Sequence, residues 1–193
     1  MEIILGTGNQ HKVFEVNEIA KDYGITFISP DGDFSPVENG TTFEENSIIK
    51  SKEASKLTNK ISLADDSGLC IDALDGAPGL YSARYAGTQQ EKISKILDEL
   101  KSVSDRKAKF VCCMSLADAE GNIIHVTVGE CHGQIIKEAK GINGFGYDPI
   151  FLPDGYNITL AEMSEDDKNL ISHRGRALRQ MLDYIIKNKD IFN

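Results

Sequence analysis

Short, mostly apolar runs alternate with amphipathic stretches along the first part of the chain. Glu2–Leu5 and Ile25–Ser29 have the length and composition that are typical of buried strands. Between them, apolar residues recur every three or four positions from Val13 to Tyr23, and Gly24 follows as a stop signal. The pattern predicts a strand, a glycine loop, a helix and a second strand.

Two further helices are indicated by their start signals. Thr41-x-x-Glu44 and Thr42-x-x-Glu45 both satisfy the capping-box pattern, so the residue that caps the second helix is left open. The same pattern at Thr88 predicts a third helix, which carries an apolar face.

The middle of the chain indicates strands. Ile61–Ala64 and Leu69–Ala73 read as two short strands that flank a pair of aspartates. Lys109–Ala117 and Ile123–Cys131 predict a hairpin, and Gln134–Lys137 is a candidate for a third antiparallel strand.

A last helix is indicated by apolar residues at helical spacing between Ala177 and Ile185. Alternating strands and helices followed by hairpins predict a mixed sheet flanked by helices, in an α/β fold with α+β as the alternative. A length of 193 residues fits one domain over residues 1–193, either compact or in two joined lobes.

Composition narrows the class of protein. The chain is 40% hydrophobic, which is enough for a core, and its apolar runs are too short to span a bilayer. The first residues lack the basic segment and long apolar stretch of a signal peptide, so we expect a cytoplasmic protein without a membrane partner.

Charge points to a small ligand. The formal net charge is −9 and the isoelectric point about 4.9, so nucleic acid is not an expected partner. Single lysines near the glycines and carboxylates fit a small polyphosphate better than a polymer.

The four cysteines form no CxxC pair and no zinc-like spacing with histidine. We expect buried reduced thiols, with the adjacent Cys112 and Cys113 on opposite faces of a strand.

The run Asp65-Asp66-Ser67-Gly68 carries the clearest chemical signal. Two adjacent carboxylates can hold a hard cation such as Mg²⁺, and one of them can deprotonate a water. A polar turn between two strands is the alternative interpretation, because Asp, Ser and Gly are common turn residues.

The first glycine loop has parts that suit phosphate. Thr7 and Asn9 offer side-chain hydrogen bonds, Gly8 permits close approach of the backbone, and Lys12 adds a cation. The loop lacks the ending of a Walker A motif, and His11 stands where a dinucleotide fingerprint has its third glycine. A helix-capping turn without a ligand is the alternative.

Two later runs suit a nucleotide. Phe145 and Tyr147 lie beside glycines, where exposed rings can stack on a nucleobase, and Asp148 can accept hydrogen bonds from ring N–H groups. Rings that fill a core under the loop are the alternative. His173-Arg174 offers a hydrogen-bonding ring and a bidentate clamp for phosphate or carbonyl, with a solvated helix start as the alternative.

Taken together, these runs resemble the inosine triphosphate pyrophosphatase family over nearly the whole chain, in the family's order. The resemblance rests on Thr7-Gly8-Asn9-x-x-Lys12, Thr42-Phe43-Glu44-Glu45-Asn46 with Lys50, Ala64-Asp65-Asp66-Ser67-Gly68, Ala77-Pro78-Gly79 with Ser82-Ala83-Arg84, Gly144-Phe145-Gly146-Tyr147-Asp148-Pro149, and Ser172-His173-Arg174. Gly6 is a departure, because many members carry alanine or serine there.

The resemblance implies Mg²⁺-dependent hydrolysis of dITP, ITP and XTP to the monophosphate and pyrophosphate. It implies a homodimer with an elongated two-lobed fold and its site in the cleft. Because all the proposed ligands are oxygens, we expect Mn²⁺ as an accepted substitute. Asp66 is implied as the proton acceptor and, with Glu38, as a metal ligand, while Asp65 and Glu45 are further candidates. The implied substrate-binding residues are Thr7, Gly8, Asn9, Gln10, His11, Lys12, Lys50, Ser67, Phe145, Gly146, Tyr147, Asp148, Lys168, His173 and Arg174.

A nucleotide-binding sensor module without catalysis is the alternative function. The presence of both Asp65 and Asp66 counts against it, because binding alone does not require a carboxylate that activates water.

Overall fold

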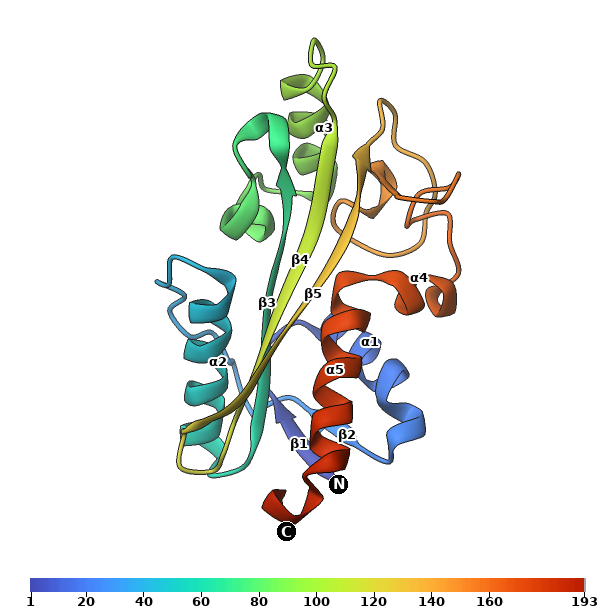
Figure 1. Ribbon diagram of the computed structural model, residues 1–193. Coiled ribbons are helices and arrows are strands. Elements are labelled where there is room, and N and C mark those ends of the chain that lie inside the picture. Colours follow the sequence, from blue (N-terminus) through green and yellow to red (C-terminus); the bar gives the residue numbers. More distant parts are fainter. Residues whose placement is uncertain (193) are drawn as a thin grey trace. The chain divides into compact units, whose positions relative to one another are not determined.

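The structure is a computed structural model that describes residues 1–192. Its strands form one mixed sheet in the order β2-β1-β3-β4-β5-β6, with helices packed against it, which confirms the predicted α/β class (Figure 1). β1 runs parallel to β2 and β3, and β5 runs antiparallel to β6. The strands are β1 (Glu2–Leu5), β2 (Thr26–Ile28), β3 (Ser62–Ile71), β4 (Lys107–Ala117), β5 (Ile123–Ile135) and β6 (Phe151–Pro153). The α-helices are α1 (Gln10–Ala20), α2 (Phe43–Thr58), α3 (Gln89–Glu99), α4 (Glu165–Ile171) and α5 (His173–Lys187).

The chain divides into two compact units. Unit 1 comprises Met1–Asp66, Cys112–Gly129 and the segment from Arg174 onward, and unit 2 comprises Ser67–Val111 and Glu130–His173. Each of β3, β4 and β5 therefore begins in one unit and ends in the other. The single domain with two lobes inferred from the sequence stays a prediction.

In unit 1, strand alternation divides β1 between two layers. Ile3 and Leu5 pack into a core with α1 and α5, while Ile4 packs with Phe34 and with Ala54 of α2. Because side chains alternate along a strand, α2 covers one face of the unit 1 strands, and α1 and α5 cover the other (Figure 1).

The contact between α2 and the sheet is close and partly polar. Ser51 Oγ lies 2.8 Å from Ser115 Oγ of β4, and Ser47 Oγ lies 3.8 Å from Cys113 Sγ. Cys112 belongs to the opposite core, so the predicted division of the two cysteines between faces is confirmed. A Cβ at Gly6 would lie 3.1 Å from the Lys50 carbonyl oxygen, so the absence of a side chain there permits the close approach of α2.

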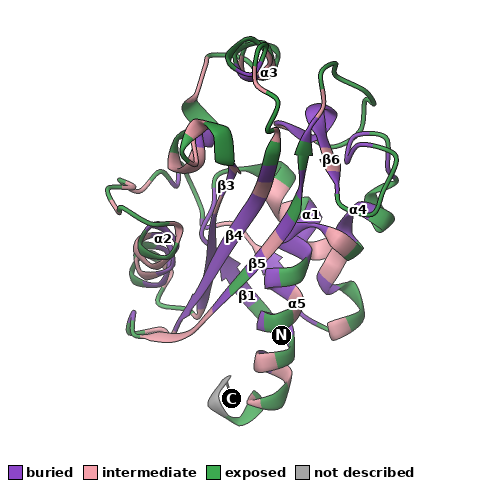
Figure 2. Ribbon diagram, turned by 45° about the horizontal axis from the view of Figure 1, so that its top comes forward, coloured by how far each residue is buried: buried purple, intermediate pink, exposed green. Residues whose placement is uncertain are grey.

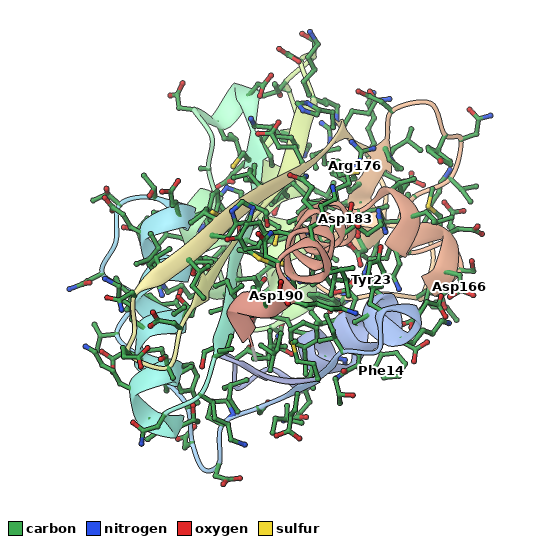
Figure 3. The ribbon with its side chains drawn as sticks, turned by 60° about the horizontal axis from the view of Figure 1, so that its bottom comes forward. Phe14, Tyr23, Asp166, Arg176, Asp183 and Asp190 are labelled. Atoms are coloured by element: carbon green, nitrogen blue, oxygen red, sulfur yellow. The ribbon has the colours of Figure 1, made fainter. Side chains whose placement is uncertain are left out.

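Burial follows these layers. The unit 1 part of β4 is buried, whereas α2 buries only the stripe of residues that faces the sheet (Figure 2). Phe14 of α1 and Arg176 and Asp183 of α5 are exposed side chains on the outer helical faces (Figure 3). Among the described residues, none of the helices combines the length and apolar character needed to cross a bilayer.

Unit 2 has its own core. Leu69 and Ile71 of β3 pack with Ile96 of α3, Phe110 of β4 and Phe151 of β6. The predicted capping box at Thr88 is present at the start of α3. Only one face of this helix is apolar, and its other residues remain in contact with solvent (Figure 2).

Two predictions about elements are wrong, and one helix is not predicted. The expected pair of short strands around the aspartates is one continuous strand, β3, which runs through Asp65 and Asp66. The candidate strand Gln134–Lys137 is wrong, because β5 continues to Ile135 and its antiparallel neighbour is β6. Helix α4 was not anticipated, since the sequence before Ser172 is dominated by charged residues.

Candidate active site

The two aspartates lie next to each other on β3 and point to opposite faces of the sheet. Asp65 faces the layer of α1 and α5, where its partners are Lys12 and Arg174. Asp66 faces α2, where its partners are Lys50 and Asn46. A strand places neighbouring side chains on alternate faces, so this pair serves two separate clusters in unit 1.

Asp65 is held between two cations. Lys12 Nζ lies 3.0 Å from each of its carboxylate oxygens, and Arg174 Nη2 lies 3.2 Å from Oδ2. Although burial opposes the charged form, Lys12 and Arg174 hold the pKa of Asp65 far below its ordinary value. Asp65 therefore stays ionised, and its carboxylate is already occupied by protein cations.

Arg174, at the start of α5, also contacts a second carboxylate. Its Nη1 donates to Glu15 Oε2 of α1 at 2.6 Å, and its side chain is 2% exposed. Burial opposes its charge, but Glu15 and Asp65 raise the pKa of Arg174 further above its ordinary value. Buried charges require such pairing, so this network ties α1, β3 and α5 together.

Asp66 belongs to a different arrangement. Lys50 Nζ lies 3.1 Å from Asp66 Oδ1 and 3.3 Å from Glu38 Oε2, and so bridges two carboxylates. Burial raises the pKa of Asp66, and Lys50 opposes this only in part. Burial also works against the charge of Lys50, yet Asp65, Asp66 and Glu38 hold its pKa above the ordinary value.

These oxygens fit a hard divalent ion. Mg²⁺ commonly uses one or two protein carboxylates together with substrate phosphates and water, and Glu38 and Asp66 already share one cationic group. Within residues 1–192, no group of three or more His, Cys, Asp or Glu side chains converges as a complete metal cage. The donor set thus matches a metal that is shared with a phosphate ligand.

The other glutamate candidate has a local role. Glu45 Oε2 accepts from Thr41 N at 2.6 Å and from Thr41 Oγ1 at 2.8 Å, while Thr42 caps α2 by accepting from Glu45 N. The bond from the Thr41 backbone lowers the pKa of the exposed Glu45. The open question of the cap is resolved in favour of Thr42.

The first glycine loop forms the start of α1. Asn9 Oδ1 accepts from His11 N at 3.0 Å, and Thr7 Oγ1 accepts from Asn9 N at 3.1 Å. The side chain of Asn9 therefore caps α1, which agrees with the alternative interpretation of this loop as a helix-capping turn. Gly8, Gln10 and His11 are exposed.

In unit 2, Asp148 and Lys168 form a buried ion pair. Lys168 Nζ lies 2.9 Å from Asp148 Oδ2, which also accepts from Phe145 N at 3.0 Å. Lys168 Nζ lies 4.8 Å from the centroid of the Phe145 ring. Gly144 has φ +70°, and a Cβ there would overlap Asp148 Oδ2, so only glycine fits.

The two aromatic residues of this loop differ. Tyr147 is 4% exposed in the unit 2 core, and its hydroxyl donates to the Ser82 carbonyl at 2.9 Å. The expectation of an exposed ring is wrong for Tyr147, and the core-filling alternative holds. Phe145 is only half-buried, and His173 stacks on Phe110 with ring centroids 4.7 Å apart.

The sequence analysis assigned no role to two residues of these clusters. Glu15 and Asn46 are both buried and both bond to groups already singled out. Their signal is a polar residue on the inward face of an amphipathic helix, next to Val16 in one case and Ser47 in the other. Ser67, the next residue along β3, is half-buried.

Fold and site define the class: an α/β protein with lysine–carboxylate clusters suited to nucleotide phosphate chemistry. The model of the Ham1 family matches residues 3–184, and the chain belongs to this family. A dITP/XTP pyrophosphatase of Bacillus anthracis is 45% identical over 194 residues, covering 95% of this chain and 96% of the relative. One from Synechocystis sp. is 42% identical over 180 residues, 93% of each chain.

Solved structures of Ham1 proteins are similar to this chain in fold and in sequence. A HAM1 protein from Coxiella burnetii has a TM-score of 0.87 and 42% identity, covering 97% of this chain and 99% of its own. The Staphylococcus aureus Ham1 protein has a TM-score of 0.84 and 39% identity, covering 97% and 99%. The resemblance drawn from the sequence motifs is thereby confirmed.

Proposed function

We propose that this chain hydrolyses dITP, ITP and XTP to the nucleoside monophosphate and pyrophosphate. The observation that carries the proposal is the pair of carboxylates, Glu38 and Asp66, bridged by Lys50 in a member of the Ham1 family. Relatives named dITP/XTP pyrophosphatases support this choice of substrates.

Glu38 and Asp66 are the proposed ligands of Mg²⁺, with Mn²⁺ as a substitute, because both ions accept oxygen ligands. When bound, Mg²⁺ polarises phosphoryl oxygens and neutralises their developing charge. We assign Asp65 to the ion pairs with Lys12 and Arg174 and Glu45 to the cap of α2, since both carboxylates already have these partners.

Asp66 is the proposed proton acceptor. Its raised pKa makes the carboxylate a better base than an exposed aspartate, and it takes one proton from the attacking water. The water oxygen bonds to phosphorus as the bond to the pyrophosphate oxygen breaks, so no covalent enzyme intermediate is needed. Lys12 and Lys50 supply positive charge for the triphosphate.

The remaining assignments concern the contacts with the substrate. Residues of the first glycine loop, Thr7 to Lys12, are proposed for the triphosphate. Phe145 offers a ring for stacking and Asp148 and Lys168 offer polar groups for the base, while Ser67, Gly146, Tyr147, His173 and Arg174 complete the proposed contacts. We also propose a cytoplasmic homodimer that acts on free nucleotides, with neither nucleic acid nor membrane as a partner.

The test is release of pyrophosphate over a panel of dITP, ITP, XTP, ATP and GTP with Mg²⁺. Rapid release from the first three, and loss of release in Asp66→Asn, are expected. Tight binding of dITP without release would identify a sensor module instead. A preference for ATP would overturn the substrate class.

A further inference from the structure

One buried side chain in unit 1 bonds both to Asp66 and to the loop that carries Glu38. Asn46 of α2 is 2% exposed, and its Nδ2 donates to Asp66 Oδ2 at 3.2 Å. Its Oδ1 accepts from Gly40 N at 2.8 Å, in the loop that carries Glu38. A single amide thus connects the strand that holds Asp66 with the loop that holds Glu38.

The two partners fix the orientation of the amide. A backbone N–H can only donate, so Gly40 must face the amide oxygen, and an ionised carboxylate can only accept, so Asp66 must face the amide nitrogen. Both requirements agree, so reversal of the amide would break both bonds.

The two carboxylate oxygens of Asp66 also have different partners. Oδ2 accepts from Asn46, whereas Oδ1 faces Lys50, which in turn contacts Glu38. The bond from Asn46 therefore sets the rotation of the carboxylate and directs Oδ1 toward Lys50, the group that Asp66 shares with Glu38.

The loop is fitted to this amide. A Cβ at Gly40 would lie 2.7 Å from Asn46 Oδ1 and 2.7 Å from Glu45 Cβ, closer than real Cβ contacts. The backbone at residue 40 thus lies directly against α2, two residues after Glu38.

We infer that Asn46 is a positioning residue, which orients Asp66 and holds the Glu38 loop so that both carboxylates serve the same metal ion. The inference rests on the proposed function, since it assumes that Glu38 and Asp66 hold the ion. Groups that orient metal ligands typically change metal affinity or activity about 10–100-fold when removed.

Asn46→Leu tests this inference, because leucine has a similar size but neither bond. Half-saturating Mg²⁺ should rise by about 10–100-fold and kcat should fall, while KM for dITP at saturating Mg²⁺ stays close to that of the wild type. Equilibrium Mn²⁺ binding to the nucleotide-free enzyme, followed by electron paramagnetic resonance, should weaken in parallel without any turnover being measured.

Asn17→Leu is the matched control. Asn17 of α1 accepts from Phe27 N at 2.8 Å and donates to the carbonyl oxygens of Val13 and Phe27, and within the described part of the chain it has no carboxylate partner. Both variants should lower the midpoint of urea unfolding, but only Asn46→Leu should change the Mg²⁺ dependence. Equal effects of the two variants on the Mg²⁺ dependence would overturn the inference.

Gly40→Ala is the second variant, for the case that Asn46→Leu does not fold. The added methyl group pushes against the Asn46 amide without changing its chemistry, so it should also weaken Mn²⁺ binding. Wild-type Mn²⁺ binding in Gly40→Ala and in any folded Asn46 variant overturns the inference. If Asp66→Asn itself binds Mn²⁺ like the wild type, the metal assignment of the proposed function fails instead.

Discussion

The adjacent aspartates of β3 show how the environment decides what a carboxylate can do. Asp65 lies between Lys12 and Arg174, which keep its pKa far below the ordinary value, whereas burial raises the pKa of Asp66. Compared with the unfolded chain, the folded state therefore favours the charged form of Asp65 more strongly and the charged form of Asp66 less strongly.

This difference predicts opposite effects of two isosteric substitutions. Asp65 contributes stability above its unfolded pKa, and that contribution is lost as pH falls through its lower folded pKa. The contribution of Asp66 is present below its unfolded pKa and is lost as pH rises through its higher folded pKa. At pH 7 without metal, Asp66→Asn should be at least as stable as the wild type.

Asp65→Asn should be less stable by about 3–5 kcal/mol, because it removes the carboxylate that Lys12 contacts and one of the two carboxylates that pair with the buried Arg174. Urea unfolding of both variants in a chelator checks this pair. Turnover of dITP by folded Asp66→Asn should fall about 10²–10⁴-fold, the usual cost of losing a general base. Wild-type kcat in that variant at saturating Mg²⁺ would remove Asp66 from the mechanism.

A second pair of substitutions distinguishes the roles of the two glutamates. Glu38→Gln should raise the Mg²⁺ concentration needed for half-maximal activity, because Glu38 shares Lys50 with Asp66. Glu45→Gln should leave that concentration unchanged, since Glu45 bonds to Thr41. Mg²⁺ titrations at fixed dITP measure both, and the reverse result would make Glu45 the metal ligand.

Arg174 distinguishes base selection from positioning. A donor that faces the C6 carbonyl of hypoxanthine or xanthine would meet another donor in adenine, which leaves buried groups unpaired. If Arg174 provides that donor, Arg174→Ala lowers kcat/KM for dITP more than for ATP. Equal losses for both would limit Arg174 to its ion pairs with Glu15 and Asp65.

At the scale of elements, α2 packs on the sheet through small polar side chains instead of a broad apolar face. Ser47 and Ser51 lie against β4, and the Ser55 hydroxyl donates to the Asp118 carbonyl. This face brings Asn46 and Lys50 of the same helix to Asp66. The face of α2 that contacts the sheet therefore buries little apolar surface, but it places polar side chains next to Asp66.

The serine pair is expected to be coupled. Ser51→Ala should destabilise the fold by about 1–3 kcal/mol, because the buried Ser115 hydroxyl loses its partner, whereas Ser115→Ala should cost less, because the Ser51 hydroxyl still bonds to the Ile48 carbonyl. The double variant should cost less than the sum of the single effects. Urea unfolding of the four proteins checks the cycle, and exposed Ser94→Ala serves as a near-neutral control. Strict additivity would show that the two hydroxyls do not interact.

At the scale of the whole molecule, the negative charge of the chain opposes the binding of a negatively charged ligand. The chain carries a formal charge of −9, and its proposed ligand is also a polyanion. Glu38 and Asp66 would repel a triphosphate unless a divalent ion lay between them.

Enzyme treated with a chelator should therefore release no measurable pyrophosphate from dITP, and Mg²⁺ or Mn²⁺ should restore release. NaCl at matched ionic strength is the control, because screening alone does not supply a ligand for both carboxylates and phosphate. Full activity without a divalent ion would contradict the metal role.

The sequence by itself determined the parts that depend on neighbouring residues. The start of α2 near Thr42, the capping box of α3 and the hairpin of β4 and β5 follow from local hydrogen bonding and periodicity. The opposite orientation of Cys112 and Cys113 follows from strand alternation alone. The motifs also identified the family, because their residues and order are present in the chain itself.

Only the tertiary structure decided which charges are paired. Asp-Asp-Ser-Gly reads as a turn, yet β3 continues through it because Lys12 and Arg174, 53 and 109 residues from Asp65, neutralise that buried carboxylate. The same holds for the burial of Tyr147, for the bridge from Glu38 to Asp66 through Lys50, and for the contacts of Asn46. Local sequence cannot specify these features, because the free energy of burying a polar group depends on partners that only the folded chain brings within reach.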